Sequence, residues 1–263
     1  MRDIKTADLQ HIEGAMFDFD GVFWPAGFAP KDVRYKIFSD ACGWAIKDLS
    51  GTSEALEVIE EENISLYLLH WEKSQDMLCE KYGVDRIAFQ RLYNKLAREN
   101  FSAQEKVYGM PCLRDEFSQL AQSTMRYGIL SHAHRDEYIV PFLDDNGLSE
   151  HINKWNIIGT RELHGKSKAD GPEPYIMMQS VLGTAFQKTV MVEDSPHNLI
   201  WAKRMGMTTI WLHDGEPSTL REGCEPYIDF HTDKFENVLR QINECNKPQE
   251  FKTDIVVPLA NKL

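Results

Sequence analysis

The chain has 263 residues, of which 42% are apolar, enough to build one large domain or a domain with an insert. Lys and Arg total 29 against 41 Asp and Glu, and the resulting net charge of -12 argues against nucleic acids and anionic membranes as partners. A site for an anionic ligand in such a chain must be made locally positive by a metal ion, a lysine or backbone amides.

The N-terminal residues 1–13 are polar and lack the apolar core of a signal peptide. No run approaches the roughly 18 apolar residues that a membrane helix needs. The five cysteines are scattered and include no Cys-x-x-Cys pair, which is typical of free thiols in a reducing compartment. We therefore expect a cytoplasmic protein with no membrane partner.

Short apolar runs that end in polar residues recur along the chain and predict buried parallel strands. They cover residues 15–17, 126–130, 155–158, 189–192, 208–212 and, more weakly, 227–230. Helical spacing of apolar residues occurs between most of them, at 113–123, 136–146, 172–181, 198–205 and 234–243. This alternation predicts an α/β fold, with an open, doubly wound and mainly parallel sheet covered by helices on both faces.

One long segment, residues 27–108, breaks this alternation because it holds amphipathic helical patterns and no strand-like run. The helices expected there cover residues 33–44, 53–61, 64–82 and 86–101. We interpret 27–108 as a helical insert after the first strand, and 1–26 with 109–246 as the α/β core. Residues 247–263 contain two prolines and are expected to form a loosely packed tail.

Polar groups gather where the predicted strands end, at the edge that forms the ligand crevice of an open parallel sheet. In the first cluster, Asp18 and Asp20 leave an extended strand two residues apart and point to the same side, and Gly21 allows a sharp turn. Close carboxylates repel each other, so the pair needs a cation or a shared proton, and Mg²⁺ accepts such oxygen ligands. A surface turn rich in Asp and Gly is the alternative interpretation.

Three further clusters follow the later strands. Ser131-His132 offers a hydroxyl and backbone amides that can hold phosphate oxygens, although a serine there also suits a helix or turn cap. Lys166 and Lys168 are both placed to neutralise a phosphate and nearby carboxylates. Glu193-Asp194 follows a buried strand, where acids without partners are unfavourable, and suits the second half of a metal site. The order of the four clusters makes the pattern specific.

In this order the residues resemble the haloacid dehalogenase-like hydrolase superfamily. The segment Asp18–Val22 resembles its first motif, Ser131 the second, Lys168 the third and Glu193-Asp194 the fourth. The resemblance covers the α/β core, and the stretch from Val192 to Asn198 is especially typical. The helical segment 27–108 lies where members with a cap between the first and second motifs carry that cap.

The resemblance implies a Rossmann-like core and an α-helical cap domain that selects the substrate. It implies that Asp18 attacks phosphorus as the nucleophile and that Asp20 acts as general acid and base. The implied cofactor is Mg²⁺, held by Asp18, the backbone carbonyl of Asp20 and Asp194, with Glu193 near or in the coordination shell.

The resemblance also implies that Ser131, the amide of His132 and Lys168 bind the phosphoryl group. Two positions depart from the usual pattern. Lys168 is followed by Ala169 where relatives often carry proline, which leaves Lys166 as a second candidate, and His132 stands where an asparagine is usual. The backbone amide survives the second change, so phosphate binding through it is still expected.

The expected activity is Mg²⁺-dependent hydrolysis of a small phosphomonoester, of the nucleoside monophosphate or sugar phosphate class, through an aspartyl-phosphate. A phosphomutase of the same fold and a non-enzymatic phosphate-binding or scaffold protein are the alternatives. A dehalogenase would lack the second acid of the first motif, so Asp20 argues against that activity. The expected partner is a small phosphorylated metabolite, and the sequence indicates no oligomeric state.

Two further side-chain groups have both a functional and an ordinary interpretation. His132 and His134 form a His-x-His pair that could bind a transition metal, but no other His or Cys lies at ligand spacing, so ordinary loop histidines are favoured. Trp24, directly after the first motif, is the candidate for a substrate contact, with core packing as its alternative.

Overall fold

The computed structural model describes residues 2–3, 5–23, 31–70, 74–108, 113–213 and 223–246. For residues 2, 31–35, 67–70 and 101–108 it describes the backbone but not the side chain. Trp24, the expected domain boundary at residues 26–27 and the expected tail at 247–263 lie outside the described residues.

Seven parallel strands form one sheet in the spatial order β1-β7-β6-β5-β2-β3-β4. In chain order they are β1 (Arg2–Asp3), β2 (Gly14–Phe17), β3 (Arg126–Leu130), β4 (Ile157–Ile158), β5 (Thr189–Glu193), β6 (Thr208–Leu212) and β7 (Phe230–Thr232). From β2 the chain moves outward through β3 to β4, then returns to the other side of β2 as β5 and continues to β7. The predicted α/β fold is confirmed, and the reversal around β2 marks where such sheets bind ligands.

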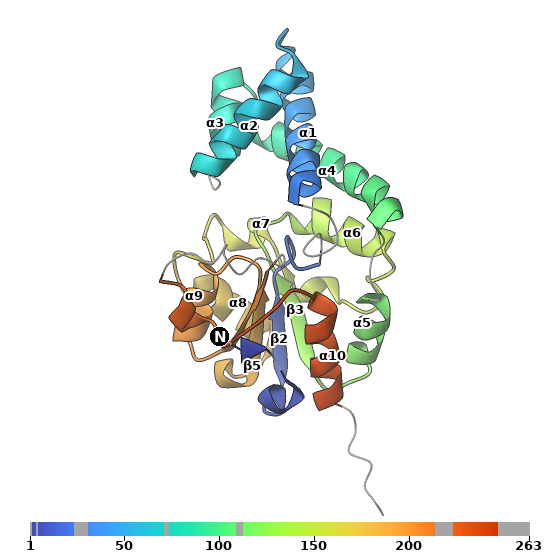
Figure 1. The fold of residues 1–263 in the computed structure, drawn as a ribbon, viewed down its shortest axis with the longest axis vertical. Helices are drawn as coiled ribbons and strands as arrows, with labels where there is room; N and C mark the ends of the chain where they lie inside the picture. Colours follow the sequence, from blue (N-terminus) through green and yellow to red (C-terminus); the bar gives the residue numbers. More distant parts are fainter. Residues whose placement is uncertain are drawn as a thin grey trace, which may run out of the picture.

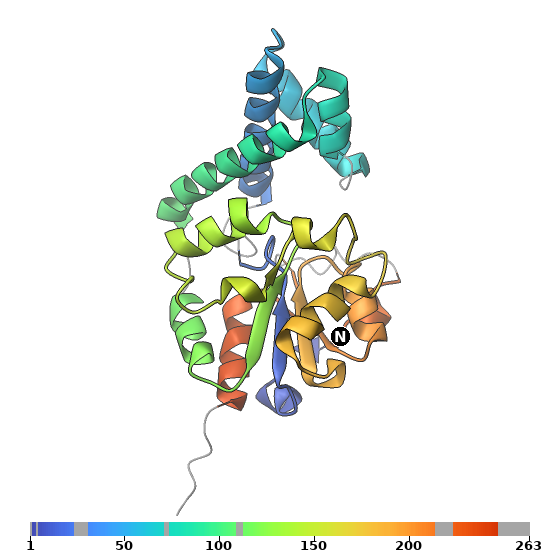
Figure 2. The same cartoon turned by 180° about the vertical axis from the view of Figure 1, so that it is seen from behind.

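Helices cover both faces of the sheet, as Figures 1 and 2 show. On one face lie α5 (Leu113–Ala121) and α10 (Phe235–Cys245), and on the other lie α8 (Glu173–Leu182) and α9 (Leu199–Arg204). Two short α-helices, α6 (Val140–Asp145) and α7 (Thr160–Leu163), lie at the edge where the strands end. The other short helices of the described residues are η1 (Thr6–Leu9), the π-helix η2 (Arg135–Ile139), η3 (Lys154–Asn156), η4 (Phe186–Lys188) and η6 (Glu225–Tyr227).

Side chains that alternate along the central strand β2 belong to two separate buried clusters, one on each face of the sheet. Ala15 and Phe17 of β2 belong to the cluster that includes Phe117 of α5, whereas Met16 belongs to the cluster that includes Tyr175 of α8. Successive side chains of a strand point to opposite faces, so a strand covered on both sides is apolar at nearly every position. This is why short unbroken apolar runs are sufficient to predict the central strands.

The described residues between β2 and α5 form four longer helices: α1 (Lys31–Ser50), α2 (Leu56–His70), α3 (Ser74–Tyr82) and α4 (Arg86–Tyr108). These described residues contain no strand, and the helices lie beyond the edge where the strands of the sheet end (Figure 1). They enclose a buried cluster of their own that includes Ile46, Ile59 and Phe89. The division of the chain into core, cap and tail stays a prediction. Over the part of the chain that the structure describes, no helix is long and apolar enough to cross a membrane.

Some element boundaries differ from the predicted ones, and packing explains the differences. β7 begins at Phe230, later than predicted, because Pro226 lies in the 3₁₀-helix η6. α2 continues through the predicted break between two helices, where Asn63 is buried. β1 has no counterpart among the predicted strands, because Arg2 and Asp3 show no apolar run and the strand is defined by its pairing with β7.

Candidate active site

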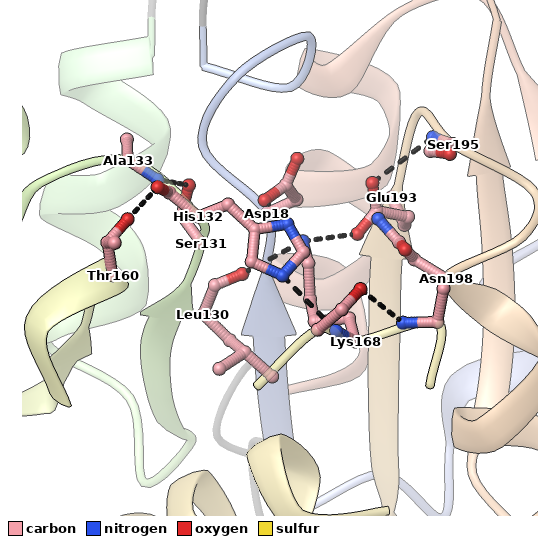
Figure 3. Close-up of polar contacts among 12 residues, drawn as sticks. Asp18, Leu130, Ser131, His132, Ala133, Thr160, Lys168, Glu193, Ser195 and Asn198 are labelled. Atoms are coloured by element: carbon pink, nitrogen blue, oxygen red, sulfur yellow. Dashed lines mark hydrogen bonds and ion pairs between the residues drawn. The ribbon is translucent and has the colours of Figure 1, made fainter. Parts of the chain in front are cut away.

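The topology brings three of the predicted motifs to neighbouring strand ends. β2 lies between β3 and β5, and Phe17 is paired with Ile129 on one side and Val192 on the other. The next residue, Asp18, donates its backbone N–H to the carbonyl of Val192 at 2.9 Å. Asp18 therefore lies level with Glu193, and Figure 3 shows Ser131 at the end of the other neighbouring strand.

Lys168 joins the acids of two strands. It lies in the loop between α7 and α8, and its Nζ is 2.6 Å from Asp18 Oδ1 and 2.6 Å from Glu193 Oε2 (Figure 3). It also donates to the carbonyl of Leu130 at 3.2 Å, and only 1% of the residue is exposed. Burial favours a neutral amine, but the two carboxylates outweigh it and raise the pKa of Lys168 above its ordinary value.

Lys166, the second candidate for this role, lies elsewhere. Its side chain is half exposed, and its Nζ pairs with Glu173 Oε1 at 3.2 Å at the start of α8. The structure therefore brings Lys168, and not Lys166, to the carboxylates of the first and fourth motifs. The sequence spacing alone left this choice open.

Contacts from three elements hold the loop that carries Lys168. The buried hydroxyl of Tyr175 lies within hydrogen-bonding distance of the carbonyl of Lys168, at 3.2 Å, and of the carbonyl of Asn198, and shares its one proton between them. The ring of His132 accepts the backbone N–H of Lys168 on Nε2 at 3.2 Å. Trp201 Nε1 donates to the carbonyl of Ala169 at 3.1 Å. These contacts fix the backbone on both sides of the lysine.

Four acids share this region with one lysine. Burial, followed by the charge of a neighbouring carboxylate, raises the pKa of Asp18, Asp20 and Asp194 to about 7. Burial also raises the pKa of Glu193 to about 7, against the lowering effect of Lys168. The unbalanced negative charge means that the site gains stability from a bound cation or from protons.

The donor atoms fit a hard cation such as Mg²⁺. Asp18, Glu193 and Asp194 each offer a carboxylate oxygen, and these three oxygens lie within 4.8 Å of one another. Oxygen donors of this kind suit Mg²⁺, which is commonly held by one or two protein carboxylates together with water and substrate phosphate. Both oxygens of Glu193 already accept hydrogen bonds, from Lys168 and from the amide of Ser195 at 3.1 Å. Asp18 and Asp194 are therefore the better placed of the three.

The loop after β3 is shaped by its own side chains. Ser131 is 1% exposed, and its Oγ accepts the backbone N–H of Ala133 at 3.0 Å, so the hydroxyl proton points elsewhere. Burial, assisted by the charge of Lys168, lowers the pKa of His132 to about 3, which makes the ring neutral. Since its Nε2 is an acceptor, the ring proton lies on Nδ1. His134 instead caps η2 by accepting the amide of Glu137 at 3.3 Å, so the two rings make separate backbone contacts.

A family model described as haloacid dehalogenase-like hydrolase matches residues 60–212, which is more than half of the chain. The chain belongs to the haloacid dehalogenase-like hydrolases. The matched range contains Ser131, Lys168, Glu193 and Asp194, whereas Asp18 and Asp20 precede it. In this hydrolase the pairing of β2 with β5 and the contact with Lys168 place Asp18 beside these residues, and Asp20 follows two positions later. The comparison with curated proteins finds no match.

Solved structures share the fold of this hydrolase at low sequence identity. A haloacid dehalogenase-like phosphatase from Thermococcus onnurineus is 16% identical, with a TM-score of 0.61 over 87% of this chain and 97% of its own. A family IA hydrolase from Entamoeba histolytica is 16% identical, with a TM-score of 0.61 over 90% of this chain and 100% of its own. A β-phosphoglucomutase from Clostridium difficile is 15% identical, with a TM-score of 0.53 over 89% and 98%.

Gly21 of this hydrolase is required by the close approach of Asp194. Gly21 has a φ of +80°, in a region of backbone conformation that residues other than glycine rarely adopt. A Cβ there would lie 1.9 Å from Asp194 Oδ2, far inside contact distance. The indole N–H of Trp211 also holds this residue by donating to the backbone carbonyl of Asp194 at 2.9 Å. The first and fourth motifs are therefore packed directly against each other.

Three aromatic residues at the site were not singled out by sequence reasoning as functional. Tyr175 holds the Lys168 loop, Trp211 holds Asp194, and the ring of Tyr138 packs edge to face against Phe19, the neighbour of Asp20. Each lies on a helix or strand among apolar residues, where sequence reasoning interprets an aromatic residue as part of the hydrophobic core. Burial of a polar tip, which shows only in the fold, is the signal that separates them from ordinary core residues.

Proposed function

We propose that this hydrolase is a phosphatase that cleaves a small phosphomonoester through a phosphorylated Asp18. The observation that supports it best is the pair of 2.6 Å contacts that tie Asp18 and Glu193 to the buried Lys168 at the ends of adjacent strands. Phosphoryl transfer asks a protein mainly for positioning and for neutralisation of charge, and this arrangement provides both. Asp20 supplies the second acid that cleavage of an alcohol from phosphorus needs, and that a dehalogenase does not need.

The proposed reaction has two steps. A carboxylate oxygen of Asp18 attacks phosphorus, the bond from phosphorus to the alcohol oxygen breaks, and Asp20 gives its proton to that oxygen. A water then attacks the phosphorus of the aspartyl-phosphate and passes a proton to Asp20. Phosphate leaves, and both aspartates return to their starting state. Ser131, the amide of His132 and Lys168 are proposed to hold the phosphoryl oxygens throughout.

We propose Mg²⁺ as the cofactor, held by Asp18, the carbonyl of Asp20 and Asp194, with Glu193 close by. When bound, the ion supplies positive charge to the phosphoryl group and to the carboxylates around it. The support is the set of three carboxylate oxygens within 4.8 Å of one another, together with the raised pKa values of these acids. A buried group of acids with a single lysine is poorly balanced without such an ion.

We propose residues 27–108 as a cap domain, with 1–26 and 109–246 as the core. The support is that α1 to α4 enclose their own apolar cluster and lie over the edge of the sheet that carries Asp18 (Figure 1). A cap in this position would select the substrate, and nucleoside monophosphates and sugar phosphates are the proposed classes. The cysteine usage supports a cytoplasmic location for this reaction.

The proposal is tested by a phosphate-release screen over nucleoside monophosphates, sugar phosphates and phosphorylated acids, with Mg²⁺ and with excess chelator. We expect release from at least one class, only with Mg²⁺, and no turnover by Asp18→Asn. Intact-mass measurement after acid quenching should find a phosphoryl group on the wild type and none on Asp18→Asn, because the variant lacks the nucleophile.

Four results would contradict the proposal. Equal activity in excess chelator would exclude the metal, and full turnover by a clean preparation of Asp18→Asn would exclude the nucleophile. Isomerisation of a sugar phosphate without release would assign the protein to the phosphomutases of this fold. A silent screen with no phosphoryl group on the wild type would favour a binding or scaffold protein.

A further inference from the structure

The ring of His132 joins the two loops that are proposed to hold the phosphoryl group. His132 follows Ser131 in the loop after β3, and its Nε2 accepts the backbone N–H of Lys168 at 3.2 Å (Figure 3). Within the described part of the chain, this ring nitrogen is the only acceptor of that N–H. The backbone amide of His132 has a role in the proposed reaction, but its ring has none so far.

The backbone from which this ring projects is held in place on both sides. Ser131 donates its N–H to the carbonyl of Ile158 at the end of β4, at 3.0 Å. The hydroxyl of Thr160, the first residue of α7, donates to the carbonyl of His132. Because the backbone is fixed, the contact of the ring with Lys168 fixes the lysine loop relative to the loop after β3.

The loop that carries Lys168 needs contacts of this kind, because the lysine lies in a turn and not in a helix or strand. The turn is closed by the N–H of Asp170, which donates to the carbonyl of Ser167 at 3.2 Å. From this turn the side chain reaches Asp18 and Glu193 at 2.6 Å each. A small rotation of the backbone at the lysine would move the distant Nζ away from both acids.

We propose that His132 is a positioning residue for Lys168, and that its ring couples the loop after β3 to the turn that carries the lysine. His132 then serves the phosphoryl group twice, through its own backbone N–H and through the lysine that its ring holds. Catalysis depends on such placement, since an error of about 1 Å can lower a rate on the order of 100-fold. This inference rests on the proposed phosphatase activity.

Asparagine and glutamine separate the two nitrogens of the His132 ring. The side-chain amide of His132→Asn ends near the former Nδ1 and is too short to reach Lys168, whereas that of His132→Gln places an acceptor near the former Nε2. We expect kcat for phosphate release to fall about 10-fold in His132→Asn and less than about 3-fold in His132→Gln. Because His132 is exposed, neither variant leaves a cavity, and both should unfold at the same urea concentration as the wild type.

A second measurement follows the contact itself. A backbone N–H exchanges with solvent more slowly while it is hydrogen-bonded. NMR should therefore find faster exchange of the Lys168 amide proton in His132→Asn and nearly wild-type exchange in His132→Gln. The matched control is His134→Asn in the same loop, because His134 accepts the N–H of Glu137 and not that of Lys168. This control should leave both kcat and the exchange of the Lys168 amide unchanged.

The possible failures are distinguishable. A wild type that releases phosphate from no phosphomonoester contradicts the proposed function, and the positioning role falls with it. If the wild type is active, full kcat in His132→Asn overturns only the role of His132. The same holds if kcat falls without faster exchange at Lys168, or if His132→Gln is as slow as His132→Asn, because the effect then does not pass through this hydrogen bond.

Discussion

Lys168 is a buried cation whose two closest partners are both acids. Its contacts to Asp18 and Glu193 are each 2.6 Å, and all three side chains are shielded from water. Removing one member of such a group is strongly unfavourable, because the remaining charges lose their compensation in a poorly solvated place. The exposed ion pair of Lys166 with Glu173 contributes much less to stability, because water screens the two charges.

Lys168 and Lys166 lie two residues apart, and their substitution should affect stability and turnover very differently. Lys168→Met should lower the free energy of unfolding by about 3 kcal/mol and abolish turnover, because Asp18 and Glu193 lose their counter-charge. Lys166→Met should change stability by less than about 0.5 kcal/mol and retain turnover. Urea unfolding and phosphate release measure both effects. Equal behaviour of the two variants would show that the contacts of Lys168 carry little energy.

The pairing of α5 with α10 depends on a buried polar contact as well as on apolar packing. Asn243 Nδ2 donates to the backbone carbonyl of Glu116 at 2.9 Å and to its Oε2 at 2.8 Å. Both residues are buried, and Arg240 reaches the same carboxylate at 3.5 Å. The contact therefore fixes the position of α10 relative to α5 along the helix axes.

We predict that Asn243→Ala lowers the free energy of unfolding by about 2 kcal/mol, because the buried Oε2 and backbone carbonyl of Glu116 then lose the donor that Asn243 supplies. The matched control is Glu244→Ala on the same helix, whose carboxylate accepts an exposed hydrogen bond from Thr6. Its loss should be below about 0.5 kcal/mol, since water replaces the bond. Chemical unfolding followed by circular dichroism measures both values, and a control variant as unstable as Asn243→Ala would refute the argument.

The whole molecule carries a net charge of -12 and also buries acids, so its stability should depend on pH and on metal. The pKa values of Asp18, Asp20, Glu193 and Asp194 lie at about 7 in the folded chain, above their ordinary values of 3.8 to 4.5. Between those limits the folded chain holds protons that the unfolded chain has released. The free energy of unfolding therefore falls as pH rises through about 7.

Thermal unfolding in excess chelator should show this trend, with Tm falling between about pH 5 and pH 8. Mg²⁺ should raise Tm, and more so at the higher pH, because the ion binds the deprotonated carboxylates. Asp194→Asn should have a flatter pH profile and a smaller response to Mg²⁺, since one titrating ligand is gone. An unchanged profile and response in that variant would contradict the proposed metal site.

Much of the fold could be predicted from local pattern. The central strands, the helices between them and the helical segment after β2 follow from the spacing of apolar residues, which a strand or helix imposes over a few neighbouring positions. Elements that depend on distant partners were missed, as β1 shows, because Arg2 and Asp3 form a strand only beside β7. The predicted break between two helices near Asn63 is also wrong, because α2 is continuous there. Burial of Asn63 outweighs the low helix propensity of asparagine.

For the site, the acids Asp18, Asp20, Glu193 and Asp194 and the hydroxyl of Ser131 could be named from the sequence, because each comes at or just after the end of a strand-like run. The lysine could be narrowed only to Lys166 or Lys168. Only the tertiary structure decided how they meet. It selected Lys168 over Lys166 and placed Gly21 against Asp194. Spacing along the chain records the period of one element, whereas the contact of Lys168 with Asp18 joins residues 150 positions apart and exists only once the sheet has assembled.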